Sequence, residues 1–338
     1  MKVLVFGGTV FLGRHLVDAL LAHGHEVTLF NRGRTRPGLF AQVAQLHGER
    51  DGKLDALAAA VQAGRRWDVA IDCSGYLPRV VRQSAQLLRD AVDRYQFVSS
   101  ISVYADFSQP GTREDAALAQ LADPAREDVP RDYGALKAAC EAVVAEIYGP
   151  RAQQVRPGLI VGPWDPTQRF TYWVQRAAQG GEMLAPGEPA APVQFIDGRD
   201  LAQWMVRLAA TELSGAFNAA GPVAGPCTFG ELIDACREAA GVPARVTWVA
   251  SAFLLAHKVG PWMELPLWLP PEDGGLFTVD LSRAAAAGLT TRPVLATVRD
   301  TLHWRNTVPE AERAERPGAG LRADREREVL DAWHQAHG

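Results

Sequence analysis

The chain has 338 residues, 47% of them hydrophobic and 22% charged, and its formal net charge at pH 7 is −4. This length allows one large α/β domain or a domain with an additional lobe, and we expect the second. The balanced charge gives no reason to expect nucleic acid or a membrane as a partner, and four cysteines without a C-x-x-C pair indicate neither a disulfide framework nor a metal site. The N-terminus leads directly into a strand pattern rather than a signal peptide, so we expect a cytoplasmic protein.

The first predicted element is a buried strand at residues 2–6, a short apolar run rich in β-branched side chains. Gly7 and Gly8 end this strand, and from Gly13 apolar side chains recur at helical spacing through residue 22. A strand, a glycine turn and a helix form the opening of a mononucleotide-binding unit, in which the helix N-terminus directs unpaired N–H groups at a phosphate. The sequence therefore predicts an anion cradle at the start of the chain.

Strands and helices alternate through the first half of the chain. The predicted strands span residues 26–30, 43–46, 68–72, 95–100 and 154–161, and the predicted helices span residues 54–61, 78–92 and 132–147. This alternation is typical of a parallel sheet, so we predict a Rossmann-type, doubly wound α/β fold. Ligands of such sheets bind outside the carboxyl ends of the strands, and Gly7 and Ser100 both lie at that edge.

Beyond residue 161 the alternation becomes irregular and aromatic side chains become frequent. The predicted regions are a nucleotide-binding Rossmann domain at residues 1–160, completed by elements near 198–220, an interleaved substrate-binding lobe at 161–304 and a charged tail at 305–338. One amphipathic pattern in the tail predicts a helix at 322–334.

Three residues from distant parts of the sequence suggest acid–base chemistry. Tyr133 and Lys137 are four apart on one predicted helix, so they share a face, and Ser100 ends the preceding strand. An unperturbed tyrosine has a pKa of about 10, and an ammonium one turn away favours the phenolate and lowers that pKa. The pattern predicts a proton relay: Ser100 binds the substrate oxygen, Tyr133 exchanges its proton, and Lys137 tunes Tyr133 and binds a ribose hydroxyl. Taken alone, the pair also fits a surface tyrosine packed along a lysine stem.

The order of these motifs resembles the short-chain dehydrogenase/reductase superfamily, specifically its extended, epimerase/dehydratase-like branch, over about residues 1–304. Residues 97–104 are similar to the Ser-Ser-x-x-Val-Tyr strand end of that branch, and residues 156–163 to its sixth strand and nicotinamide-facing turn. The resemblance implies a nicotinamide cofactor and a homodimer formed through the helices after the fourth and fifth strands. Val10 stands where the branch has the middle glycine of G-x-x-G-x-x-G, which makes the chain similar to an atypical subgroup.

The residues after the second strand bear on the choice between NADP and NAD. An NAD-specific member offers an acid to the ribose 2′-hydroxyl, and Asn31 stands in that place. Arg32 can form charge-assisted hydrogen bonds to a 2′-phosphate, so NADP is favoured and NAD stays possible. Alternatively, the arginines here belong to a solvated loop. The cofactor contacts expected from the motifs and the resemblance, with Glu49 and Arg50 near the adenine, are Gly7, Thr9, Val10, Phe11, Leu12, Gly13, Asn31, Arg32, Arg34, Glu49, Arg50, Cys73, Ser74, Gly75, Ser99, Pro157 and Gly158.

The substrate is expected to be a small molecule, and several departures from the branch narrow the range of possible substrates. Ile101 and Ser102 stand where similar dehydratases carry an Asp-Glu pair, and Leu159 and Val193 stand where epimerases place an Asn and a diphosphate-binding Arg. A nucleotide sugar would therefore lack its usual anchors. The Pro-bounded stretch at 262–268 is a candidate lid. The predicted substrate contacts are Tyr76, Arg169, Tyr172, Trp173 and Gln194.

The leading hypothesis is an NADP-dependent oxidoreductase that transfers a hydride between nicotinamide and a carbonyl or secondary alcohol. The first alternative is an NAD(P)-dependent sugar or nucleotide-sugar epimerase, which differs in consuming no free cofactor. The second is a non-catalytic, cofactor-sensing or RNA-associated member, against which the intact Ser100, Tyr133 and Lys137 argue.

Overall fold

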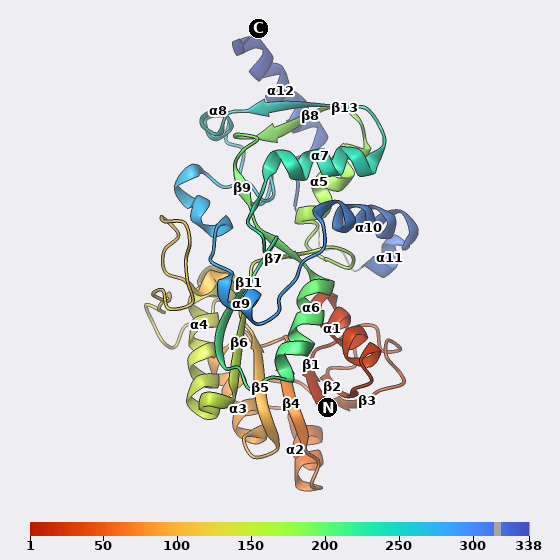
Figure 1. Cartoon of the computed structure of the whole chain (residues 1–338), viewed down its shortest axis with the longest axis vertical. Coiled ribbons are helices and arrows are strands. Elements are labelled where there is room, and N and C mark those ends of the chain that lie inside the picture. Colours follow the sequence, from red (N-terminus) through yellow and green to blue (C-terminus); the bar gives the residue numbers. More distant parts are fainter. Residues whose placement is uncertain (314–318, 338) are drawn as a thin grey trace.

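The computed structural model describes residues 1–313 and 319–337. Residues 314–318 and 338 of the predicted tail lie outside the described residues. Within the described part, a parallel sheet occupies one half of the molecule and a smaller lobe the other, with the N-terminus in the sheet and the C-terminal helix at the far end of the lobe (Figure 1). None of the helices described combines the length and hydrophobicity needed to span a bilayer.

The central sheet has seven strands in the order β11-β6-β5-β4-β1-β2-β3, and every neighbouring pair is parallel. This confirms the predicted doubly wound α/β fold. Its strands are β1 (Lys2–Phe6), β2 (Glu26–Asn31), β3 (Ala44–His47), β4 (Trp67–Asp72), β5 (Val92–Val98), β6 (Ala152–Pro157) and β11 (Gly215–Ala219). Phe6 lies opposite Phe30 and Asp72, so the segments that follow β1, β2 and β4 start side by side at one edge. The strand order reverses between β1 and β4, which is where such sheets bind ligands.

Helices cover both faces of the sheet (Figure 1). They are α1 (Phe11–Ala22) and α6 (Gly198–Ala209) on one face, and α2 (Asp55–Gln62), α3 (Pro78–Leu88) and α4 (Val129–Tyr148) on the other. The alternation within β1 shows the two cores: Val3 and Val5 pack with the α1 and α6 side chains, whereas Leu4 and Phe6 pack with those of α2, α3 and α4. Both faces of β1 are buried, which is why its sequence is apolar throughout.

Two predicted elements end elsewhere than the sequence pattern indicates. The helix predicted at 78–92 ends at Leu88, because Val92 already pairs with Trp67 as the first residue of β5. The strand predicted at 154–161 divides at Gly158: β6 stays in the central sheet, whereas β7 (Leu159–Val161) leaves it and pairs with β10 (Phe195–Asp197). The division directs the chain out of the sheet and into the lobe.

The lobe has its own buried core, which includes Phe170, Trp173, Phe229 and Trp268. The remaining elements are α5 (Arg169–Ala178), β8 (Gly181–Pro186), β9 (Pro192–Val193), β12 (Cys227–Thr228), α7 (Phe229–Ala240), β13 (Ala244–Val249), α8 (Ser251–Ala256), α9 (Ser282–Ala286), α10 (Val294–Thr307), α11 (Glu310–Arg313), α12 (Ala323–His337) and the 3-10 helices η1 (Ile101–Val103), η2 (Gly149–Arg151) and η3 (Pro271–Phe277). Helix α12 occupies the segment where the tail sequence predicts a helix, and Val329 and Leu330 join it to the lobe core.

Candidate active site

A cavity of about 920 Å³ lies at the carboxyl edge of the sheet. The predicted catalytic residues Ser100, Tyr133 and Lys137 line it together, and so do Tyr76 and Arg169. The predicted cofactor contacts that line it are Gly7, Thr9, Val10, Phe11, Leu12, Gly13, Asn31, Arg32, Arg34, Glu49, Arg50, Cys73, Ser74, Ser99, Pro157 and Gly158. Gly75 lies beneath the wall instead, packed so closely that a Cβ there would meet the Phe97 ring at 2.6 Å.

The glycine turn after β1 forms one end of the cavity. Gly7 and Gly8 have φ values of 100° and 94°, in the left-handed region that favours glycine. A Cβ on Gly13 would lie 2.8 Å from the backbone nitrogen of Gly8, so only glycine lets the first turn of α1 approach this closely. Val10, at the N-cap, offers no capping side chain, which leaves the first N–H groups of α1 available to an anion. These features fit the pyrophosphate of a dinucleotide.

Asn31 and Arg32 form the wall after β2. The Asn31 side chain accepts a hydrogen bond from the Gly33 N–H (2.7 Å) and donates one to Gln45 Oε1 (3.3 Å), so Asn31 shapes the turn. Arg32 is exposed, and no ion pair to it occurs among the described residues. Its guanidinium is thus available beside the place where a ribose would lie.

Arg50, a predicted adenine contact, lines the cavity and is also paired within the protein. Its guanidinium forms an ion pair with the buried carboxylate of Asp72 and donates to Ser84 Oγ (2.6 Å). Arg50 is therefore part of the cavity floor, with its charge neutralised from within the protein. Glu49 pairs with Arg34 at 3.5 Å, at the rim.

Close packing of α4 against η1 brings Tyr133 to Ser100. A Cβ on Gly134 would overlap the carbonyl oxygen of Ser102, so the glycine after the tyrosine is required for this contact. Ser100 caps η1, because its Oγ accepts from the Ser102 N–H at 3.1 Å and lies 3.1 Å from Ser102 Oγ. The Ser100 hydroxyl is near enough to the Tyr133 phenol to lower the pKa of that phenol.

The groups that most shift the pKa of Tyr133 in this structure are not the one predicted from the sequence, which was Lys137. Burial raises the pKa of Tyr133, and a hydrogen bond with Ser100 and the charge of Arg169 oppose that rise. The Lys137 ammonium instead donates to the carbonyls of Gly75 (2.7 Å) and Val98 (2.6 Å), and burial lowers its pKa to about 8. An ammonium has three N–H donors, so one remains for a ligand hydroxyl. The effect of Lys137 on the Tyr133 pKa therefore stays a prediction, whereas the charge of Arg169, which the sequence did not indicate, lowers that pKa.

Three predicted substrate contacts do not line the cavity, and the structure gives each a packing role. Trp173 is fully buried in the lobe core and donates its indole N–H to the Pro266 carbonyl (2.7 Å). The Tyr172 ring packs 4.8 Å from that of Trp173. The Gln194 amide donates to the Val279 carbonyl and accepts from its N–H, which joins two backbone segments. These predictions are corrected accordingly.

The segment after β7 supplies a wall that the sequence reasoning missed, apart from Arg169. Asp165 is fully buried and accepts from both the N–H and the hydroxyl of Thr167, each at 2.8 Å. Arg169 Nε donates to the same Thr167 hydroxyl (3.2 Å), and its guanidinium lies 5.0 Å from the centroid of the Trp262 ring. Trp262, from the candidate lid, also lines the cavity. The signal in the sequence was the Asp-x-Thr spacing of residues 165–167, which is typical of an Asx turn.

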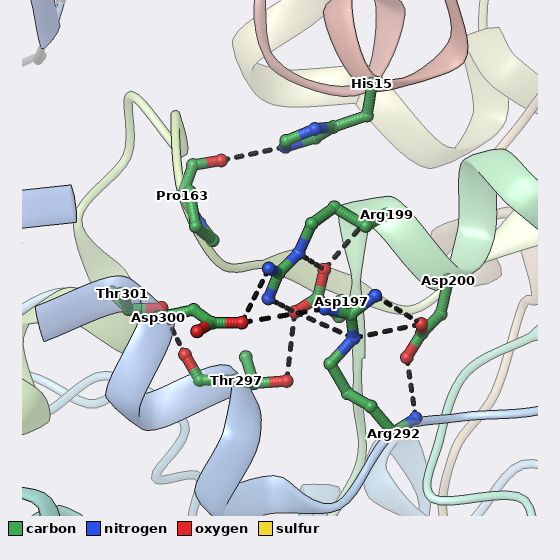
Figure 2. A network of polar contacts seen from close by, with 9 residues as sticks. All are labelled: His15, Pro163, Asp197, Arg199, Asp200, Arg292, Thr297, Asp300 and Thr301. Carbon is green, nitrogen blue, oxygen red and sulfur yellow. Dashed lines mark hydrogen bonds and ion pairs between the residues drawn. The ribbon is translucent and has the colours of Figure 1, made fainter. Parts of the chain in front are cut away.

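A polar network holds this segment in place (Figure 2). His15 of α1 is hydrogen-bonded through Nε2 to the Pro163 carbonyl (2.9 Å), and burial lowers the His15 pKa, so the ring is neutral. Asp197 lies against Gly162, where a Cβ would approach its carboxylate to 3.3 Å, and it accepts hydrogen bonds from Arg199 (2.7 Å) and Thr297 (2.9 Å). The His15 hydrogen bond thus joins the wall to α1, and the separate Asp197 cluster, which packs against Gly162, joins the end of β10 to α6 and α10.

Together, a parallel sheet with a glycine turn at its switch point and an adjoining cavity lined by Ser100, Tyr133 and Lys137 define a Rossmann-type fold with a site that fits a dinucleotide. The sequence model of the NAD dependent epimerase/dehydratase family matches residues 3–220, and the chain belongs to this family.

Two relatives with assigned names are similar over most of this chain. The chloroplast stem-loop binding protein of 41 kDa b from Arabidopsis thaliana is 27% identical over 258 residues, which are 72% of this chain and 64% of that protein, so this chain spans less than two thirds of that relative. The 2-alkyl-3-oxoalkanoate reductase of Stenotrophomonas maltophilia is 27% identical over 293 residues, 79% of this chain and 83% of that protein.

Solved structures share the fold. The Bordetella bronchiseptica enzyme WbmG, in complex with NAD and UDP, matches with a TM-score of 0.67 at 18% identity, over 90% of this chain and 95% of that one. UDP-N-acetylglucosamine 4-epimerase from Bacillus cereus matches with a TM-score of 0.67 at 16% identity, over 92% and 98%. At these identities the likeness establishes the architecture and not the substrate.

Proposed function

We propose that the protein is an NADP-dependent oxidoreductase that interconverts a carbonyl compound and the corresponding secondary alcohol. The observation that carries this proposal is the meeting of Ser100, Tyr133 and Lys137 at one cavity wall, next to a glycine turn that fits a dinucleotide. Bound nicotinamide supplies or accepts the hydride. The residues of the protein bind and orient the substrate and transfer the proton.

The protonation state of Tyr133 at neutral pH favours carbonyl reduction. Because burial raises the pKa of Tyr133, its phenol holds a proton that it can give to the substrate oxygen as the hydride arrives. Ser100 orients that oxygen by a second hydrogen bond. Lys137, with one donor left, binds a ribose hydroxyl and keeps the loop after β4 joined to the end of β5. In the reverse direction Tyr133 accepts the proton.

The side chains after β2 support NADP as the cofactor. Asn31 presents no carboxylate that would repel a 2′-phosphate, and its hydrogen bond to Gly33 fixes the turn that carries Arg32. The Arg32 guanidinium can form charge-assisted hydrogen bonds to that phosphate. NAD remains the alternative cofactor.

The composition of the wall beyond Tyr133 favours a reductase over an epimerase of sugars. Leu159, Ile160, Trp262 and Leu276 are apolar residues of the cavity lining, whereas sugar hydroxyls need polar partners. The relative named as a 2-alkyl-3-oxoalkanoate reductase acts, by its name, on a carbonyl compound with an apolar chain. A nucleotide-sugar epimerase is the second candidate, since WbmG binds NAD and UDP on the same fold.

Two accompanying proposals concern the state of the protein. We expect a cytoplasmic homodimer formed through α3 and α4, which the family resemblance implies, and light scattering of the purified protein would report its mass. RNA association, suggested by the name of the Arabidopsis relative, is a third candidate function that does not require Tyr133.

The decisive test is net cofactor turnover. The purified protein is mixed with NADPH and a panel of ketones and aldehydes, and loss of the reduced-nicotinamide absorbance is followed. In parallel, UDP-sugars are incubated with bound cofactor and analysed for epimers. Net NADPH oxidation by an apolar carbonyl compound supports the proposal, whereas epimer formation without net oxidation would replace it by the second candidate.

A further inference from the structure

Arg169, at the first position of α5, carries hydrogen-bonding capacity that the protein does not use. Its Nε donates to Thr167, but Nη1 and Nη2 form no hydrogen bond and no ion pair with any of the described residues. The neighbouring carboxylate, Asp165, gives both its oxygens to Thr167, and burial raises the Asp165 pKa, which weakens it as a counter-ion. A mostly buried guanidinium therefore faces the cavity without a partner for its two terminal amino groups.

The position of this guanidinium is fixed by its surroundings. The Trp262 ring lies 5.0 Å from it, a distance typical of cation–π contact, and Thr167 holds Nε. Thr167 in turn is bonded to Asp165, in the segment that the network of Figure 2 ties to the sheet. The guanidinium is thus oriented in advance, which limits the entropy lost when it binds a ligand.

The same guanidinium is electrostatically coupled to the catalytic phenol. Arg169 and Tyr133 line one cavity. The charge of Arg169 lowers the pKa of Tyr133, and Tyr133 raises the pKa of Arg169. An unsatisfied, desolvated guanidinium is unfavourable by itself, and a planar carboxylate or a phosphate matches its paired N–H donors. Trp262 lies beside the guanidinium, and Leu276 is a further apolar residue of the cavity lining.

We propose that Arg169 binds an anionic group of the substrate, a carboxylate or a phosphate, so that the carbonyl next to Tyr133 belongs to an oxo acid or an oxo phosphate ester with an apolar chain. This inference rests on the proposed function and specifies its substrate class. The anion is held by Arg169, the reacting oxygen by Ser100 and Tyr133, and the apolar chain by Trp262 and Leu276. Arg169 acts here as a substrate-binding residue, and the proton and hydride steps stay as described.

The first experiment compares a 3-oxo acid with its methyl ester as substrates, both with NADPH. The wild-type protein is expected to prefer the acid by roughly 10- to 100-fold in kcat/KM, the range for a charge-assisted hydrogen-bonded pair. Arg169→Gln should remove that preference by raising the KM of the acid, and Arg169→Lys should restore part of it. The ester, which offers no anion, reports separately any effect of the lost charge on Tyr133. Arg299→Gln, at an exposed position of α10, serves as the matched control.

The second experiment measures binding without turnover. In protein loaded with NADP, a saturated carboxylic acid, its amide and the corresponding phosphate monoester are titrated against the tryptophan fluorescence of the wild type and Arg169→Gln. Arg169-dependent binding of the acid or the phosphate supports the inference, and the tighter of the two identifies the source of the anion. Equal binding of acid and amide overturns the inference, as does an Arg169→Gln variant that loses NADP instead of the acid.

The two experiments separate the inference from the proposed function. If reduction of ketones consumes NADPH but the acid and the ester react equally well, the proposed oxidoreductase activity is supported and the proposed role of Arg169 is wrong. If the acid binds through Arg169 but no carbonyl compound consumes NADPH, the anion site stands and the oxidoreductase is wrong.

Discussion

At the scale of single residues, the spacing of Tyr133 and Lys137 predicted their meeting with Ser100, but not what each does. Helical geometry places residues four apart on one face, so the pair could be found without a structure. The partner of Lys137 could not, because the carbonyls of Gly75 and Val98 reach it only through the fold. The cation that acts on Tyr133 is Arg169, from a segment distant in the sequence.

Arg32 and Arg34 show how neighbouring arginines can differ in availability. Arg34 pairs with Glu49 at 3.5 Å, whereas no ion pair to Arg32 occurs among the described residues. We predict that Arg32→Ala weakens NADP binding by roughly 10- to 100-fold, the effect of losing charge-assisted hydrogen bonds, and leaves NAD binding unchanged. Dissociation constants for both cofactors test this, with Arg237→Ala on α7 as the control. Tighter binding of NAD than NADP, with no effect of Arg32→Ala, would show that the loop is merely solvated.

At the scale of elements, the sequence identified most strands and helices but not where the chain leaves the sheet. Residues 154–161 read as one strand because the apolar run Leu159–Val161 follows Gly158 directly, yet β7 pairs with β10. Helix α5 shows a second limit. Arg169 faces the cavity, but Trp173, one turn later, is buried in the lobe core. An aromatic residue serves a core and a pocket equally well, so its type alone does not decide between them.

Gly134 controls the approach of α4 to η1. A Cβ at this position would overlap the Ser102 carbonyl, so we predict that Gly134→Ala displaces the start of α4 and with it Tyr133. The expected cost in the free energy of unfolding is about 1–3 kcal/mol, together with a loss of turnover beyond what this destabilisation explains. Urea unfolding and steady-state rates measure both effects.

Ala142→Gly is the matched control for this variant. It lies on an exposed part of the same helix and should lose about 1 kcal/mol from helix propensity while turnover persists. Equal activity of the two variants at equal stability would mean that the contact between α4 and η1 does not position Tyr133.

At the scale of the whole molecule, the network of Figure 2 joins the sheet half to the lobe. Asp197 ends β10, Arg199 lies in the first turn of α6, Arg292 precedes α10, and Asp300 lies on α10, so one cluster of charges links both halves. The cavity lies between walls from these halves, because Tyr133 comes from α4 of the sheet and Trp262 from the lobe. The alignment of the catalytic residues with the substrate wall therefore depends on this connection.

His15 makes the connection sensitive to pH. Its folded-state pKa is lowered by burial, whereas the unfolded chain binds the proton near the ordinary pKa of about 6.5. The stability that the neutral ring provides is therefore complete above about pH 6.5 and is lost as the pH falls toward the lower folded-state value. We predict that the urea midpoint of the wild type falls more between about pH 7.5 and about pH 5 than that of His15→Gln, which keeps an N–H donor for Pro163. An equal fall in the urea midpoint of the two proteins over this pH range would contradict the prediction.

The measurement that tests the central claim most directly is turnover and cofactor binding by Tyr133→Phe. Removing the phenolic hydroxyl leaves the glycine turn and Lys137 in place, so NADP should bind with an unchanged dissociation constant while NADPH-dependent carbonyl reduction falls by roughly 10²- to 10⁴-fold. Tyr148→Phe, which removes a buried hydroxyl from the far end of α4, should keep its activity. Full turnover by Tyr133→Phe would contradict the account, because no proton relay through Ser100 and Tyr133 would then be needed.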